Sequence, residues 1–473
     1  MNKALLPLLL ASIFAAHSAQ AATNLIAIGT LSGTMSDLST QTAGLLENGI
    51  AGNLLGGVGS AFAWAGGNTF IATPDRGPNA LAYNALVADT TSYIDRFQTI
   101  SFALTQNTGL GLAYNLTPTL TNTTLLSSAT PLTYGTGALG TGGTNILGSG
   151  VPALNAINNT HYFTGRSDGF NAALPSSNPN NARFDPEGAR VSNDGKSVFI
   201  SDEYGPYINQ FDRATGQRIK SFALPANLAV AVQGPTTGVE GSSFNTTGRV
   251  ANKGMEGLAI TPDGKTLVGI MQAPLLQDAK NQVRIVTVDI ATGATKQFGY
   301  RLTTGSGVSE IVAVNDHEFL VDERDGKGLG DAPGSVAVVK QLFKIDLTGA
   351  TDISGVVSMT SATPAVGKTL FLDIRAALNL NGIVDTQIPS KIEGLAFGQD
   401  LADGRHTLWI TNDNDFDATN AGDNKFYVFA VDAASLPTFQ AQSIAAVPEP
   451  ETFAMLLAGL GLIGFIGRRR KAV

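Results

Sequence analysis

The chain has 473 residues, a formal net charge of −8, 14% charged residues and no cysteine. The acidic excess argues against a nucleic-acid-binding protein, which needs a basic surface, and it suits a protein that binds divalent cations. Without cysteine the chain can form no disulfide and carries no cysteine nucleophile. Length alone would allow about two or three domains, but the repeats described below favour one large β structure.

The N-terminus has the features of a secretory signal peptide. Lys3 precedes an apolar run over residues 4–16, and Ala19-Gln20-Ala21 supplies the small residues of a cleavage site. The apolar run is too short to cross the ~30 Å hydrocarbon core of a bilayer as a helix that rises ~1.5 Å per residue. We therefore expect export and the removal of residues 1–21.

The body of the chain, residues 22–446, repeats one pattern. A glutamate stands directly before a short strand, a hairpin follows, and a polar or acidic group returns after the second strand. The glutamates are Glu187, Glu256, Glu310 and Glu393, and the returning groups are Asp202-Glu203, Gln272, Asp322-Glu323 and Asn412-Asp413. An earlier unit begins at Ser60 and returns Asp75-Arg76.

Short strands separated by turn residues, in repeated units, predict an all-β fold of the β-propeller type. Outer strands also end in matching phrases, in which Asp212, Asp289 and Asp346 each precede a Thr-Gly pair. Five blades are readable, and residues 106–180 form either a degenerate sixth blade or an insertion, so we expect six or seven blades. A jelly roll or sandwich would not place the same phrase at the same point of each unit.

In a propeller blade, the residue before the innermost strand and the residues after the second strand lie at the same rim. The repeated carboxylates therefore converge there, and Ca²⁺ takes about six to eight oxygen ligands of this kind. The metal-ligand candidates are Glu187, Glu256, Glu310, Glu393, Asp322 and Asp413, and the catalytic candidates are Glu187, Glu256, Asp202 and Glu203. The alternative is that each glutamate accepts backbone hydrogen bonds and pins neighbouring blades together.

Cations lie close in sequence to the same carboxylates. A phosphate ester needs both a divalent cation and guanidinium donors, so the substrate-binding candidates are Asp75, Arg76, Arg324 and Lys391. Arg190 lies near Glu187 in the same way. The alternative is that these cations form salt bridges with the rim acids. Residues 413–417 have an Asp-x-Asp-x-Asp rhythm that fits either a peripheral calcium loop or a solvated turn.

Several other chemistries lack their sequence signatures. The chain has no Gly-x-Ser-x-Gly elbow of the α/β hydrolases and no phosphate-binding glycine loop between a strand and a helix. His161, His317 and His406, which remain after signal removal, lack metal-motif spacing and an Arg-His-Gly context. The sequence therefore argues against a histidine phosphatase mechanism.

The C-terminal residues 447–473 combine a Pro-Glu-Pro triplet at 448–450, an apolar stretch over 452–467 and a basic cluster over 468–471. The basic cluster is expected on the cytoplasmic side. This order resembles the PEP-CTERM sorting signal of Gram-negative bacteria. The resemblance implies transient anchoring, processing by an exosortase near the triplet and delivery to the cell surface, outer membrane or extracellular matrix. A permanent single-pass anchor is the alternative.

The body resembles a family as well, through residues 183–188, 201–206, 252–258 and 391–396, with residues 75–79 fitting its first blade. These segments are similar to the phytase-like propeller domain, described as having esterase-like activity of phytase, over about residues 56–432. The resemblance implies an esterase-like activity, and together with the rim carboxylates it leads us to expect a Ca²⁺-dependent hydrolase of a small phosphoester or related ester. The alternatives are a non-catalytic propeller that binds extracellular polysaccharide or a protein partner, and a lactonase-like hydrolase. We expect a monomer without a nucleic-acid partner, in contact with membrane only through its C-terminal segment.

Overall fold

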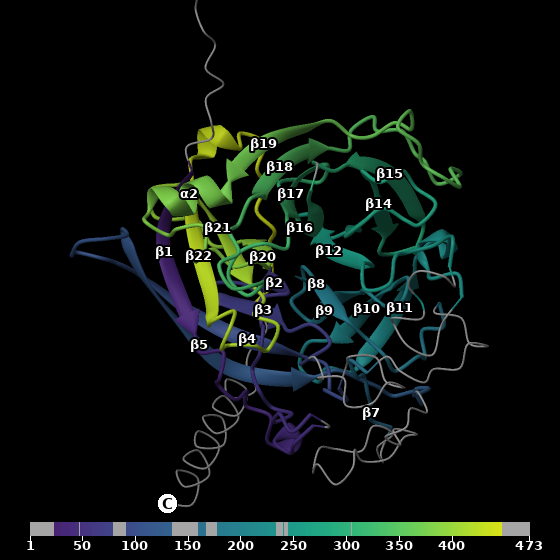
Figure 1. Ribbon diagram of the computed structural model, residues 1–473, viewed down its shortest axis with the longest axis horizontal. Coiled ribbons are helices and arrows are strands. Elements are labelled where there is room, and N and C mark those ends of the chain that lie inside the picture. The colour runs from purple at the N-terminus through teal and green to yellow at the C-terminus, as the bar shows by residue number, and fades with distance from the viewer. Residues whose placement is uncertain are drawn as a thin grey trace, which may run out of the picture.

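The computed structural model describes residues 23–46, 48–78, 91–134, 159–166, 177–232, 240, 245–303 and 305–446. Within these residues, five four-stranded antiparallel sheets surround a central axis (Figure 1), so the fold is the all-β propeller that the sequence predicts. The predicted signal peptide and the C-terminal sorting segment lie outside the described residues. Among the described residues, no helix is long and apolar enough to cross a membrane.

Each sheet is one blade, whose strands follow one another from the axis outward. Blade one contains β2 (Ala61–Trp64), β3 (Thr69–Thr73), β4 (Arg96–Gln106) and β5 (Tyr114–Leu125). Blade two contains β8 (Pro186–Val191), β9 (Ser197–Asp202), β10 (Tyr207–Asp212) and β11 (Arg218–Ala223). Blade three contains β12 (Met255–Ile260), β13 (Thr266–Met271), β14 (Gln282–Asp289) and β15 (Thr295–Arg301).

Blade four contains β16 (Gly307–Ala313), β17 (Glu318–Arg324), β18 (Lys340–Asp346) and β19 (Lys368–Asp373). Blade five contains β20 (Ile392–Phe397), β21 (His406–Asn412), β22 (Asn424–Val431) and, from the other end of the chain, β1 (Thr23–Leu31). The shorter elements are β6 (Ser127–Ser128) paired with β7 (His161–Tyr162), α2 (Ile374–Leu380), η1 (Thr40–Thr42), η2 (Ala226–Leu228) and η3 (Ala433–Ser435).

The ring closes with five blades in the described part of the chain, not with the six or seven that we expected. The innermost strands contact one another in the order β2, β8, β12, β16 and β20, and β20 contacts β2 again. No described blade therefore stands between blades one and two. Of residues 106–180, the described parts contribute β5, the small β6–β7 pair and connecting loops. Residues 135–158 and 167–176 lie outside the described residues.

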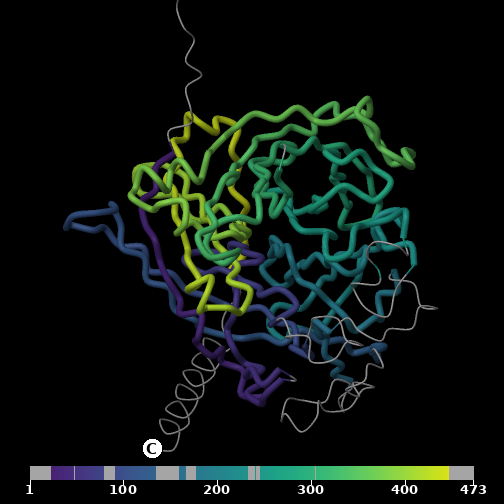
Figure 2. Tube along the Cα trace, viewed as in Figure 1, coloured from purple at the N-terminus to yellow at the C-terminus, as the bar shows by residue number. Residues whose placement is uncertain are grey.

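The N-terminal strand completes the last blade. β1 pairs with β22 in antiparallel register from Thr23 opposite Val431 to Leu31 opposite Asn424, and the two strands run side by side in Figure 2. This pairing covers an edge of blade five that would otherwise expose unpaired backbone groups. Two segments about 400 residues apart in sequence are thereby joined by a sheet's hydrogen bonds, and the joint closes the ring.

Apolar side chains fill the spaces between neighbouring blades. Between blades one and five, Phe62 stacks on Phe70 with ring centroids 4.7 Å apart, and Phe70 lies 4.6 Å from Trp409. Aromatic pairs of this kind contribute about 0.5–1.5 kcal/mol beyond the burial of their area. Apolar packing between the faces of neighbouring sheets therefore holds each blade against the next.

A bulge at the start of the inner strands sets which side chains reach the axis. In β12 the residue that the bulge inserts is Glu256, because Met255 pairs with Met271 and Gly257 with Ile270. In β16 the inserted residue is Ser309, because Val308 pairs with Glu323 and Glu310 with Asp322. Glu310 therefore takes the position of a glycine in the other units, one residue away from the register that the sequence repeat indicated.

The glycine after a rim glutamate is required by close packing of the inner strands. A Cβ on Gly188 would lie 2.6 Å from the backbone nitrogen of Leu258, and a Cβ on Gly257 would lie 2.8 Å from Glu310 Cα. Both distances are too short for a side chain. The glycine of each of these Glu-Gly pairs is thus needed because the inner strands of neighbouring blades lie too close together for a side chain.

Candidate functional site

The candidate site lies at the end of the axis where the inner strands begin and the second strands end, which we call the mouth. Three glutamates occupy the bulges of blades two, three and five there, namely Glu187, Glu256 and Glu393. They are 8%, 2% and 3% exposed. The sequence prediction that these glutamates converge is consistent with this arrangement.

The glutamates raise one another's pKa through electrostatic repulsion. Burial raises the pKa of Glu256 to about 8, and the neighbouring Glu393 carboxylate adds to the rise. Burial, followed by repulsion from Glu256, raises the pKa of Glu187 well above its usual range. Burial disfavours an ionised carboxyl and a second carboxylate nearby adds to that cost, so this part of the mouth favours either protonation or a positive charge.

Three carboxylates form a compact group on the blade-two side of the mouth. One oxygen from each of Asp185, Glu187 and Glu203 lies within 4.8 Å of the others, and all three residues are buried. Burial raises the pKa of Asp185 and of Glu203 to about 7. Glu203 Oε2 is buried and has no hydrogen-bond partner among the described residues. We call this group the carboxylate trio.

Two arginines border the trio and the glutamates. Arg76 donates to Asp185 from its backbone nitrogen over 3.0 Å and from Nη1 over 3.3 Å. Arg324 Nη2 contacts Glu393 Oε1 and lies 3.7 Å from Glu256 Oε1. Arg324 Nε is buried without a partner among the described residues. The expected proximity of these cations to the rim acids is present, and each of the two is held by a carboxylate.

The remaining contacts of Glu256 leave part of its carboxyl group unsatisfied. Gln272 Nε2 donates to Glu256 Oε1 over 2.6 Å. The Oε2 atoms of both Glu256 and Glu393 are buried and have no hydrogen-bond partner among the described residues. Unpaired buried polar atoms are uncommon in folded proteins, and each one is a candidate contact for an ion or water.

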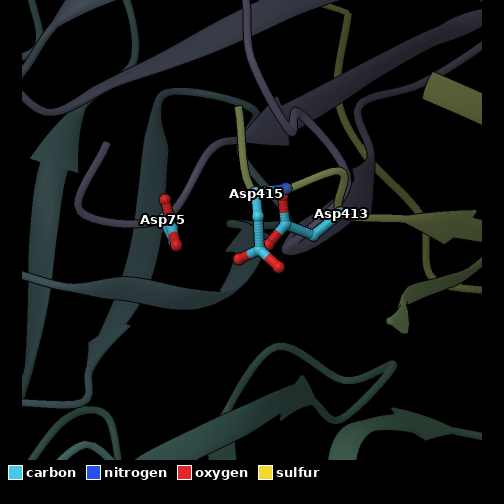
Figure 3. A group of neighbouring side chains, drawn as sticks. All are labelled: Asp75, Asp413 and Asp415. Carbon is cyan, nitrogen blue, oxygen red and sulfur yellow. Dashed lines mark hydrogen bonds between the residues drawn. The ribbon is translucent and has the colours of Figure 1, made fainter. Parts of the chain in front are cut away.

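A second acidic group lies on the blade-five side of the mouth. Oxygens of Asp75, Asp413 and Asp415 lie within 4.8 Å of one another (Figure 3). Lys391 Nζ donates to Asp413 Oδ2 over 2.9 Å and also contacts Asp415 Oδ1. The Asp-x-Asp-x-Asp segment is therefore neither peripheral nor a simple solvated turn, because two of its aspartates face the mouth and are bound by a lysine.

Glu310 lies below the mouth and pairs with Arg190. Arg190 Nη2 lies 3.1 Å from Glu310 Oε2, and Glu310 Oε1 accepts hydrogen bonds from the backbone nitrogens of Leu258 and Ile311 over 2.8 and 2.9 Å. The guanidinium also donates to the backbone oxygens of Phe62, Ile311 and Leu395 over 2.9, 2.7 and 3.1 Å. This buried pair, the axial plug, touches all five blades and does not join the trio.

Two further candidates lie behind the mouth. Asp202 Oδ1 accepts hydrogen bonds from the backbone nitrogens of Asp185 and Tyr204 over 3.1 and 2.9 Å, so it positions the segments that carry the trio. Asp322 accepts a long 3.4 Å hydrogen bond from Ser309 Oγ. Burial raises the pKa of Asp202 to about 7 and that of Asp322 to about 8.

Sequence reasoning did not select Asp185 or Asp95 as site residues. Asp185 stands two residues before the bulge glutamate of its strand, the place that Lys391 takes before Glu393. This shared position relative to the bulge glutamate could have identified Asp185 as a residue of the mouth. Asp95 is fully buried, neither of its carboxylate oxygens has a hydrogen-bond partner among the described residues, and burial raises its pKa well above the usual range. Nothing in the repeat pattern marks this residue.

A polar groove of about 320 Å³ adjoins the mouth between blades three and four. Its lining includes Lys253, Gln272, Lys280 and Arg324. Asp325 also lines it, but Lys340 Nζ lies 2.8 Å from that carboxylate. The groove is therefore positively charged and meets the acidic mouth at Arg324.

Two separate parts of the chain match known protein families. Residues 446–471 match the PEP-CTERM protein-sorting motif, which implies export, membrane anchoring and processing by an exosortase in Gram-negative bacteria. Residues 53–416 match the family described as esterase-like activity of phytase. Residues 417–445 fall in neither match.

Individual relatives are more distant. An uncharacterized secreted protein of Arthroderma benhamiae is 29% identical over 178 residues, which cover 30% of this chain and 34% of that protein. The chain thus spans about a third of that relative's length.

Among solved structures, a putative 6-phosphogluconolactonase from Bacteroides uniformis is 14% identical with a TM-score of 0.29, covering 82% of this chain and 91% of that one. The PQQ-bound aldose sugar dehydrogenase of Streptomyces coelicolor is 10% identical with a TM-score of 0.31, covering 86% and 98%. Hydrazine synthase of Kuenenia stuttgartiensis is 12% identical with a TM-score of 0.31, covering 76% and 78%. It is the match over residues 53–416, most of the chain, that assigns this protein: it belongs to the family described as esterase-like activity of phytase.

Proposed function

We propose that this protein is an exported, surface-directed hydrolase of phosphoesters or related esters that works with a divalent cation, Ca²⁺, held in the mouth. The observation that carries the proposal is the carboxylate trio, whose oxygens lie within 4.8 Å of one another in a buried setting. Three carboxyl groups this close repel one another when ionised. A cation between them removes that repulsion.

The donor set fits a hard cation. Ca²⁺ prefers carboxylate, carbonyl and water oxygens, and the trio offers only carboxylates, with Glu203 Oε2 unpartnered among the described residues. Asp185, Glu187 and Glu203 would hold the ion, and Glu256 adjoins them. A divalent cation bound there supplies Lewis-acid polarisation of a phosphoryl oxygen and favours ionisation of water at neutral pH.

The arginines provide the anion-binding half of the site. Arg76 and Arg324 are 15% and 12% exposed at their side chains, so both reach solvent at the mouth while their acids hold them in place. Arg324 Nε is a buried donor without a described partner. A phosphate oxygen at this atom would satisfy it with a charge-assisted hydrogen bond. The remainder of the substrate would then extend into the groove lined by Lys253 and Lys280.

Glu256 is suited to proton transfer. Its pKa is raised to about 8 by burial and by Glu393, so it holds its proton at neutral pH before a cation or substrate binds. Groups that transfer protons work best when their pKa lies near the working pH. In this proposal Glu256 gives a proton to the departing alkoxide oxygen, and Arg324 orients the phosphoryl group beside it.

The test uses purified residues 22–446, loaded with Ca²⁺, on a panel of phosphomonoesters and lactones. Glu187→Gln and Glu256→Gln should abolish most of the turnover. Glu318→Gln is the matched control, because Glu318 begins β17 at the opposite end from the mouth and binds Lys344 there. Turnover that persists unchanged in both mouth variants would contradict the mechanism. Calcium binding without any turnover would favour a non-catalytic role, and hydrolysis of lactones alone would favour a lactonase.

A further inference from the structure

The last part of the segment between the two family matches folds against the propeller. It follows β22 and η3, and we call residues 436–446 the strap. Gln440 donates from its backbone nitrogen to Val314 O over 2.9 Å, and Ala445 donates in the same way to Asn193 O over 2.8 Å. Gln442 Nε2 donates to Val191 O and Asn193 Oδ1, each over 2.8 Å.

These contacts place the strap on the face opposite the mouth. The inner strands begin at the mouth, so the turns that follow them lie at the other end of the axis. Val314 follows β16, Val191 is the last residue of β8, and Asn193 belongs to the turn after β8. The strap therefore crosses from blade five over blade four to blade two, and it covers the end of the axis that we call the closed face.

The strap is packed rather than loosely laid across this face. Leu436 is 1% exposed and belongs to the apolar core of blades four and five. The Phe439 ring lies 4.6 Å from the ring of Phe397 and 4.2 Å from that of His406. A cavity of only about 50 Å³ remains between the strap and Arg190 of the axial plug. That space holds a few water molecules at most, so the plug and strap together seal this end.

The N-terminal end of the described chain lies at the same face. Thr23 pairs with Val431, and Val431 pairs with His406 at the start of β21. Because β21 follows the turn after an inner strand, its first residue lies at the closed face. Both Thr23 and the end of the strap are therefore positioned opposite the mouth.

We propose that the strap fixes the orientation of the propeller on its membrane tether, with the closed face toward the membrane and the mouth away from it. Residues 447–451, which separate the strap from the apolar stretch, span at most about 17 Å when fully extended. An inner strand such as β8, with 6 residues, is itself about 20 Å long, and the turns add to that thickness. The linker is too short for the domain to turn over.

This orientation determines which substrates reach the site while the protein is tethered. The mouth takes up molecules that are dissolved on the side of the membrane where the propeller lies, and not headgroups of the membrane that carries the tether. This orientation depends on the strap and the sorting segment alone. It holds whether or not the mouth hydrolyses an ester, so its failure and the failure of the proposed function are separate outcomes.

The absence of native cysteine allows a direct test with single introduced thiols. Lys253 precedes β12 at the mouth and Lys265 precedes β13 at the closed face, and both side chains are exposed in the same blade. The full chain carrying either Lys253→Cys or Lys265→Cys is reconstituted into phosphatidylglycerol–phosphatidylethanolamine vesicles. Its modification by a bulky, membrane-impermeant maleimide is timed, and the same reaction in detergent gives the reference rate.

The vesicles should slow modification at position 265 several-fold and leave the rate at position 253 unchanged. A long Gly-Ser insertion after Ala446 should remove the difference, because a flexible linker frees the domain to rotate. Equal protection at both positions, or stronger protection at position 253, would overturn the proposal. A difference that survives the insertion would also overturn it, because the short linker would then not be its cause.

Discussion

The axial plug makes a strong and measurable prediction for stability. In the native protein the Arg190 guanidinium binds backbone carbonyls of three strands besides its own and forms an ion pair with Glu310. Arg190→Met removes both kinds of contact. Breaking a buried pair by removing one partner costs about 3–5 kcal/mol. A domain is stabilised by only about 5–15 kcal/mol in total, so this loss should be visible as a large fall in the urea midpoint, followed by tryptophan fluorescence.

The pH dependence of that loss follows from Glu310. Burial raises its pKa to about 8 even with Arg190 present. A carboxyl group whose folded-state pKa is raised favours folding below its unfolded pKa, and that contribution is lost as the pH rises through the folded value. The variant should therefore lose more stability at pH 8.5 than at pH 6, where Glu310 carries a proton. The double variant Arg190→Met/Glu310→Gln should recover at least ~1 kcal/mol at pH 8.5, since it removes the unpaired charge.

Arg301→Met is the matched control, because Arg301 is exposed at the end of β15. Surface substitutions of this kind usually change stability by less than ~0.5 kcal/mol. If Arg190→Met unfolds at the same urea concentration as Arg301→Met, the plug does not hold the blades together, and the reasoning from its hydrogen bonds is refuted.

Three further predictions concern the mouth, the inner strands and the strap. Burial raises the pKa of Asp185 and Glu203 to about 7 and that of Glu256 to about 8. Calcium-free protein should therefore lose thermal stability as the pH rises from about 6 to 8.5, and Ca²⁺ should restore it. A melting temperature of the calcium-free protein that rises with pH would contradict this. Gly188→Ala should cost about 1–3 kcal/mol through its contact with Leu258, whereas Gly367→Ala, with no atom within 4 Å of the new Cβ, should be neutral in the same denaturant titration. Phe439→Ala should cost about 1 kcal/mol for a half-buried ring, and an unchanged melting temperature would show that the strap is not packed in solution.

The sequence repeat predicted the architecture because each blade is a local unit. Strand, hairpin and outer turn lie close together in the chain, and the aspartates before Thr-Gly cap their own turns: Asp289 Oδ1 accepts hydrogen bonds from Thr292 N and Oγ1, each over 2.7 Å. Closure is not local. The pairing of β1 with β22 and the direct contact of β20 with β2 depend on segments from opposite ends of the chain, so blade number was overestimated.

The site was predicted in part for a related reason. A repeated glutamate indicates which residues share a rim, but a one-residue bulge decides which side chain faces the axis. In blade four the phrase is Ser309-Glu310 where the others have Glu-Gly, and the glutamate turns to Arg190 instead of the mouth. The missing glycine was the readable sign of that shift. The pairing of Lys391 with Asp413 and Asp415 required the folded loop and could not be read from spacing.

Calorimetric titration of calcium into residues 22–446 at pH 8 tests directly whether the mouth binds a cation. We expect saturable binding that Glu187→Gln and Glu203→Gln each weaken at least ~10-fold, a difference of about 1.4 kcal/mol in binding free energy. Glu318→Gln should leave calcium binding unchanged. No saturable calcium binding by the unaltered protein, or binding of equal strength in both trio variants, would contradict the assignment of the mouth as a cation-dependent site.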